Sequence, residues 1–122
     1  MRDVFLVALG GGMGAAARHL VGLASLRALG PAFPYGTLIV NVLGSLLMGL
    51  LVEWLARRGT PLRPLLAAGF LGGFTTFSTF SLDAVALWER GEGTTAAIYV
   101  AGSVVLGLAG LVAGLAIGRA VL

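Results

Sequence analysis

Four long apolar segments are the feature that most constrains the fold of this chain. They run over residues 4–26, 37–55, 65–88 and 95–121. Each is close to the ~20 residues that a helix needs to cross ~30 Å of hydrocarbon. The connections between them are rich in glycine, proline or charge, as in "ARRGTPLRP" at 56–64 and "ERGEG" at 89–93. We therefore predict an all-α integral membrane protein with four transmembrane helices in a single domain, residues 1–122.

The composition supports a membrane location and excludes several functions. Of the 122 residues 58% are hydrophobic and 11% are charged, whereas a soluble domain has about 25% charged residues. The net charge is only +3, which leaves no basic surface for nucleic acid. The chain has no cysteine and one histidine, His19, so neither disulfides nor a thiolate or histidine metal cluster is expected.

The first segment has an alternative interpretation as a cleavable signal peptide. The stretch "MRDVFLVALGGGMGAAARHL" at 1–20 and the residues after it stay apolar for longer than the 7–15 residues typical of a signal core. We therefore expect it to be a permanent helix.

Arginine counts bear on orientation. Four spans place both termini and the 56–64 connection on one side, which would carry Arg2, Arg57, Arg58, Arg63 and Arg119. The other side would carry Arg27 and Arg90. The arginine-rich side is therefore predicted to be cytoplasmic, with a modest bias.

Glycine stripes account for much of the remaining pattern. The 20 glycines include sets at helical spacing: Gly10, Gly14 and Gly22; Gly44 and Gly49; Gly110, Gly114 and Gly118. Small residues spaced in this way let helices approach closely in lipid. Tight packing does not explain the polar members of the same stripes, Arg18 and Asn41.

Those two polar side chains are costly inside a membrane. Asn41 either makes an interhelical hydrogen bond that joins the bundle or faces a wet cavity. Arg18 cannot be neutralised by deprotonation, so it either extends to the membrane interface or faces water or a partner. The sequence leaves both pairs of alternatives open.

The stretch "LGGFTTFSTFS" at 71–81 predicts a break in the third helix. Gly72 and Gly73, followed by Thr75 and Thr76, combine residues that weaken a helix with hydroxyls that can bond locally to the backbone. A break at membrane depth must be buried in protein or line a cavity, and its freed carbonyls are suitable ligands for a hard cation.

Beyond the break, Phe77 and Phe80 are neighbours on one helical face. A pair at this spacing is usually core, but here hydroxyl side chains surround it. Phenyl edges, hydroxyls and an amide N–H can replace water around a small anion without a fixed charge that would trap it. Four short helices scarcely enclose a pore, so at least a dimer is expected.

Three stretches together carry a family resemblance. "GGMGAAARH" at 11–19, "GTLIVNVLGSLLMG" at 36–49 and "GFLGGFTTFSTFS" at 69–81 resemble the signature stretches of the bacterial and archaeal fluoride channel family, called Fluc or CrcB. The resemblance implies passive fluoride export across the cytoplasmic membrane. It also implies an antiparallel, dual-topology homodimer with two pores and a central structural sodium ion. Dual topology calls for nearly balanced loops, which the arginine count of five against two does not match.

The resemblance assigns roles to individual positions. Phe77 and Phe80 match the phenylalanines that line the fluoride path, and Asn41 matches the pore asparagine. The other expected members of the path are Thr76, Thr79, Ser81 and, by a looser match, Ser103.

The same resemblance implies an ion site and a vestibule. The backbone carbonyls of Gly72 and Thr75 would hold sodium, two from each subunit. Arg18 would draw anions to the aqueous mouth. Two positions depart mildly from the family pattern: His19 replaces the commoner tyrosine, and Asp83 replaces the commoner glutamate.

Three other classes of protein fit less well. A small four-helix multidrug transporter needs a membrane-embedded carboxylate, which the first helix lacks beyond Asp3, while Glu53 and Asp83 are interpreted as solvated residues near helix ends. A non-transporting subunit that serves only in assembly would not need Asn41 or a helix break lined by hydroxyls. An enzyme is not expected, because no nucleophile, base and orienting group come together.

Overall fold

The computed structural model describes all 122 residues and is helical throughout. The elements are α1 (Arg2–Leu29), α2 (Tyr35–Arg58), η1 (Pro64–Leu71), α3 (Gly72–Phe74), α4 (Ser78–Glu89) and α5 (Gly93–Val121). The consecutive elements η1, α3 and α4 form the third of four spans that are long and apolar enough to cross a membrane. The prediction of four helices is confirmed, and their ends lie within about three residues of the predicted ones.

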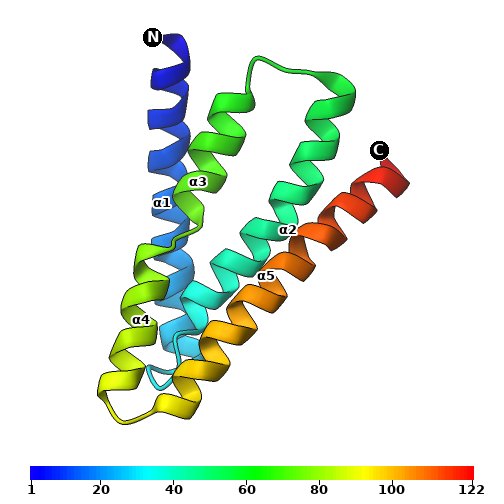
Figure 1. Ribbon diagram of the computed structural model, residues 1–122. Coiled ribbons are helices and arrows are strands. Elements are labelled where there is room, and N and C mark those ends of the chain that lie inside the picture. The colour runs from blue at the N-terminus through cyan, green and yellow to red at the C-terminus, as the bar shows by residue number, and fades with distance from the viewer.

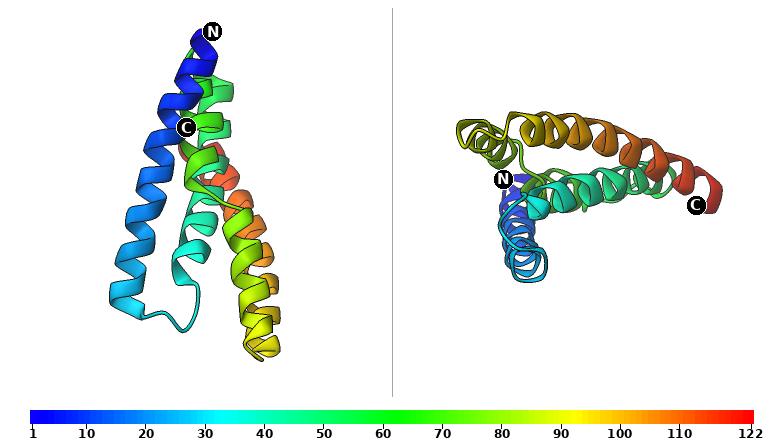
Figure 2. Two further views of the ribbon diagram at one scale, coloured as in Figure 1. Left: turned by 90° about the vertical axis from the view of Figure 1, so that its left-hand side faces the viewer. Right: turned by 90° about the horizontal axis from the view of Figure 1, so that it is seen from below.

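The four spans form two arms that diverge toward one end of the molecule. α1 packs along η1 and α3, and α2 packs along α5 (Figure 1). At the other end α4 packs against α5, and the views in Figure 2 show α1 standing apart from α5. Both termini lie at the open end of the arms, as an even number of spans requires.

Glycines make the contact between α1 and η1 possible. A Cβ at Gly14 would overlap the carbonyl of Phe70, and a Cβ at Gly73 would overlap the carbonyl of Gly11. η1 itself is a π-helix of eight residues, an element that the sequence analysis did not predict. Its wide turns follow the close approach to α1, a kind of distortion that is common near functional sites.

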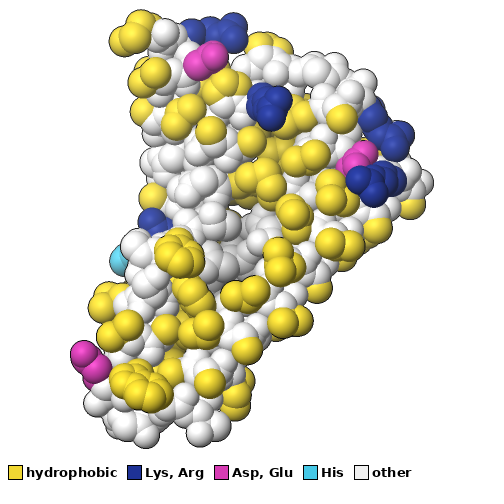
Figure 3. Space-filling model, viewed as in Figure 1, with side chains coloured by type: hydrophobic (Ala, Val, Ile, Leu, Met, Phe, Trp, Pro, Cys, Tyr) yellow, Lys and Arg dark blue, Asp and Glu magenta, His cyan; other side chains and the backbone are white.

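The chain has little interior of its own. Only 14 of its 122 residues are buried, and the one apolar cluster, Leu87, Ala96 and Tyr99, joins α4 to α5. Large apolar side chains therefore cover the outside, as expected in lipid. The surface is hollowed between the arms, and arginine side chains gather at the end that carries the termini (Figure 3). The predicted asymmetry of charge is present in the fold.

Candidate functional site

The third span breaks where Thr75 adopts an extended conformation, with φ −86° and ψ 159°. Gly72 and Gly73 remain helical, so the break lies slightly later than the glycines alone suggest. Both the N–H and the hydroxyl of Thr75 donate to the carbonyl of Leu71, at 3.1 and 2.9 Å. The helical pattern ends with this residue, because the N–H of Thr76 donates to Asn41 instead. α4 then starts at Ser78.

Asn41 holds the broken backbone from α2. Its Nδ2 donates to the carbonyl of Thr76 at 2.9 Å, and its Oδ1 accepts from the N–H of Thr76 at 2.8 Å. These two bonds satisfy the backbone N–H and carbonyl of Thr76, which a continuous helix would have satisfied itself. Asn41 therefore bonds α2 to the broken span. One N–H of its amide has no protein partner and is available to a ligand.

Arg18 also binds the break, from α1. Its Nε donates to the carbonyl of Gly73 at 3.0 Å. The side chain therefore points into the protein, which decides between the two alternatives left open by the sequence. It lines a hollow of about 220 Å³ together with His19, Thr37, Thr76 and Thr79, which we call the arginine hollow.

The carbonyls of the break fall into two groups. Those of Leu71, Gly73 and Thr76 accept hydrogen bonds from side chains, as described above. Those of Gly72 and Thr75 accept none from the chain. Gly72 and Thr75 line one open hollow, and two carbonyl oxygens are part of the oxygen shell that a hard cation prefers. No group of three His, Cys, Asp or Glu side chains offers an alternative metal site.

Asn41, Thr76 and Ser103 line that same hollow, which has a volume of about 580 Å³ and which we call the break hollow. The hydroxyl of Ser103 is buried and has no hydrogen-bond partner. Phe77 stands at its edge with 79% of its side chain exposed.

The two predicted phenylalanines lie together and continue into a third aromatic ring. The ring centroids of Phe77 and Phe80 are 5.7 Å apart, and those of Phe80 and Tyr99 are 5.3 Å apart. These are ordinary distances for interacting aromatic pairs. The row connects the break to the interior of the α4–α5 pair.

The prediction that Asp83 is a solvated residue near a helix end is wrong. It is partly buried in the middle of α4, and its Oδ2 accepts from the hydroxyl of Thr37 at 2.8 Å and from that of Tyr99 at 3.1 Å. The carboxylate therefore joins three spans. Glu53, the other carboxylate, pairs with Arg119 at 2.8 Å near the ends of α2 and α5.

Three neighbouring hollows share polar lining residues. Thr76 lines both the break hollow and the arginine hollow. Thr37 lines both the arginine hollow and a third one of about 300 Å³, here called the loop hollow, whose lining includes Asp83, Arg90 and the α1–α2 connection. Polar groups therefore continue from the break to one end of the molecule.

Most of the site residues expected from the sequence meet at or near the break, with one exception. Thr79 lines the arginine hollow, and its N–H is bound by the hydroxyl of Thr76 at 3.2 Å. The hydroxyl of Ser81 donates to the carbonyl of Phe77 at 2.9 Å, within its own helix, and lines none of the three hollows.

Thr37 and Tyr99 are site residues that the sequence analysis missed. Both have a recognisable signal: Thr37, Asn41 and Ser45 recur at intervals of four, as do Tyr99 and Ser103. That spacing places polar side chains on one face of a helix. Extending each stripe by one turn would have found them.

Comparison with known proteins identifies the family and several relatives of this chain. Residues 5–115 match the model of a family described as "CrcB-like protein, Camphor Resistance (CrcB)". A Cereibacter sphaeroides protein named fluoride-specific ion channel FluC is 62% identical over 90% of this chain and 89% of its own length. Proteins of the same name from Rhizobium etli and Paracoccus denitrificans are 54% and 58% identical, each over 98% of this chain and 98% and 97% of their own.

Proposed function

The chain belongs to the CrcB-like family, an ion channel family and not an enzyme family, and we propose that it conducts fluoride passively out of the cell. The resemblance stated from the three sequence stretches is thereby confirmed. Its four apolar spans make it a multi-pass membrane protein. We place it in the cytoplasmic membrane, the location that export from the cytoplasm requires.

One observation carries the proposal: a broken span at which amide, hydroxyl and phenyl groups converge. Asn41 keeps one free N–H, and Phe77 and Phe80 lie in a row 5.7 Å apart. Polar hydrogens and phenyl edges solvate a compact anion, whereas larger halides fit a narrow, donor-lined path poorly. Transport then needs only the fluoride gradient.

Efflux from liposomes tests this proposal. Liposomes loaded with fluoride or with chloride are diluted into an ion-free solution, and a fluoride or chloride electrode follows the release. The native protein should release fluoride and retain chloride. Phe80→Ile should reduce fluoride release to that of empty liposomes, because the aromatic row is interrupted.

Leu82→Ile is the matched control on the same helix, since that side chain is 69% exposed. It should release fluoride at the native rate. Trapped fluoride in liposomes that contain folded native protein would contradict the proposal.

We also propose that the working unit is an antiparallel dimer with two paths. Its support is the ring of Phe77, which lines the break hollow and is 79% exposed in one chain. A second copy inserted between the diverging arms would cover that ring. Cross-linking in native membranes tests the dimer. Reporter fusions at the C-terminus test the antiparallel arrangement, because a cytoplasmic and a periplasmic reporter should both be active.

A structural sodium ion between the two copies completes the proposal. The free carbonyls of Gly72 and Thr75 fit half of its oxygen shell, and the second copy would supply the other half. The ion would join the two breaks and fix the Thr75 backbone. Exchanging sodium for a large organic cation should lower the melting temperature of the dimer, whereas an unchanged melting temperature would contradict the sodium site.

A further inference from the structure

The loop hollow contains two charges of opposite sign. Asp83, Ala86, Leu87 and Arg90 line it from α4, at the i, i+3, i+4 and i+7 spacing of one helical face. Asp83 lies on the inner side, where it binds Thr37 and Tyr99. Arg90 follows the last residue of α4, about 10 Å further along the axis at 1.5 Å per residue. Arg90 is the one cation among the residues that line this hollow.

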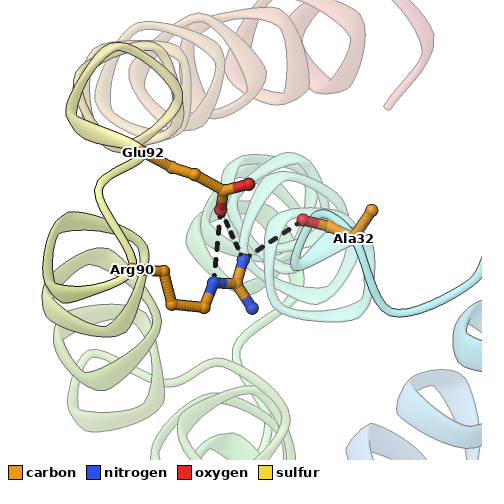
Figure 4. Close-up of polar contacts among 3 residues, drawn as sticks. All are labelled: Ala32, Arg90 and Glu92. Atoms are coloured by element: carbon orange, nitrogen blue, oxygen red, sulfur yellow. Dashed lines mark hydrogen bonds and ion pairs between the residues drawn. The ribbon is translucent and has the colours of Figure 1, made fainter.

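Arg90 is held in a defined position at the rim. Its Nη2 and Nε donate to the same Oε2 of Glu92, at 2.7 and 3.2 Å, and its Nη2 also lies 3.4 Å from the carbonyl of Ala32 (Figure 4). The guanidinium thereby joins the end of α4 to the α1–α2 connection. Its Nη1 takes part in none of these bonds, so two N–H groups remain available to a hydrated anion.

An arriving anion meets a carboxylate in this hollow. Without Arg90, the lining would carry the single negative charge of Asp83 and would repel fluoride. With Arg90 the two charges offset each other, and the cation is the one nearer the opening. Glu92 does not line the hollow, but its contact with Arg90 reduces the field that an anion meets at the rim.

We propose that Arg90 sets the rate at which fluoride enters this end of the path, by offsetting Asp83, and that Glu92 moderates that attraction. The proposal rests on the fluoride channel function proposed above. The contact of Arg90 with Glu92 and Ala32 would then have an electrostatic role at the mouth, in addition to closing a turn. Arg90 acts on arriving anions, whereas the groups at the break act on the ion during passage.

Single-channel fluoride current in planar bilayers tests the proposal. Fluoride is kept at a low concentration, and ionic strength is varied with an impermeant anion. Arg90→Gln should lower the current about threefold at low salt, the effect of a unit charge about 7 Å away in water. The difference should vanish at high salt, where the Debye length is ~3 Å. Glu92→Gln should raise the current about twofold at low salt.

Two further variants separate charge from structure. Arg90→Lys keeps the charge but not the paired contact with Glu92, so it should conduct like the native protein at low salt. Arg27→Gln removes a charge at the same end of the molecule outside the hollow, and at low salt it should lower the current less than Arg90→Gln does. Equal losses in Arg90→Gln and Arg90→Lys at all salt concentrations would overturn the proposal, as would a native current in Arg90→Gln. Absence of current in the native protein would instead refute the channel function itself.

Discussion

The α2–α5 pair and the broken third span are stabilised in different ways. Along α2 and α5 the glycines bring two continuous helices into backbone contact: a Cβ at Gly114 would overlap the carbonyl of Leu46. At the break, helix continuity is lost, and Asn41 and Arg18 supply the missing hydrogen bonds from other spans. Close backbone packing therefore stabilises the α2–α5 pair, whereas polar side chains from α1 and α2 stabilise the break.

The largest expected effect is on the α2–α5 pair. Gly114→Leu forces the two backbones apart, because the obstructing atom belongs to the Leu46 main chain. We expect about 3 kcal/mol or more of destabilisation and a clearly lower melting temperature. Thermal unfolding in detergent measures it.

Gly102→Leu is the control on the same helix, since a Cβ there meets nothing within 4 Å. It should melt like the native protein. A stable, native-like Gly114→Leu variant would show that the pair is not packed backbone to backbone.

Asn41→Asp should give the next largest effect, on conduction. The carboxylate would face the Thr76 carbonyl where an N–H now donates, and it would repel a passing anion. A buried group left without its partner costs ~1–3 kcal/mol, so we expect a roughly 100-fold fall in fluoride flux. The folded protein should remain, as judged by gel filtration.

Ser45→Ala, one turn further along α2, removes a hydroxyl that binds only the Asn41 carbonyl and should leave flux nearly unchanged. Equal flux in Asn41→Asp and in the native protein would remove Asn41 from the path.

Much of the fold can be predicted from the sequence, because length and apolarity alone define a span. The break also has a local signal in the sequence, in Gly72, Gly73 and the threonines that follow. The hydrogen bond between Asn41 and Thr76 has no local signal, because the two residues are 35 positions apart and are brought together only by helix packing. The π-helical turns of η1 depend in the same way on the backbone of α1, which no local pattern records.

Arg18→Lys is expected to have an intermediate effect. Lysine keeps the charge but loses the Nε that reaches the Gly73 carbonyl at 3.0 Å. A hydrogen bond from a charged group contributes about 1.5 kcal/mol or more, which corresponds to roughly tenfold lower flux if the bond shapes the break. Native flux in this variant would mean that Arg18 acts through its charge alone. Liposome efflux distinguishes the two.

Glu53→Gln should have the smallest effect. Its ion pair with Arg119 lies at the end of the α2–α5 pair, where the arginine side chain is 65% exposed. We expect a loss of about 0.5 kcal/mol in unfolding free energy and no change in flux. A clear loss of flux would mean that the path extends to this end of α5.

The interruption at Thr75 also has an electrical consequence. It places the carboxyl end of one helical segment, η1 with α3, close to the amino end of another, α4. The peptide dipoles of a helix give its carboxyl end about half a negative charge and its amino end about half a positive charge. One interruption can thus present a negative pole to a cation and a positive pole to an anion within a few residues. The protein would thus offer two ions of opposite sign the partial charges of its peptide dipoles, in addition to the formal charge that Arg18 brings to the break.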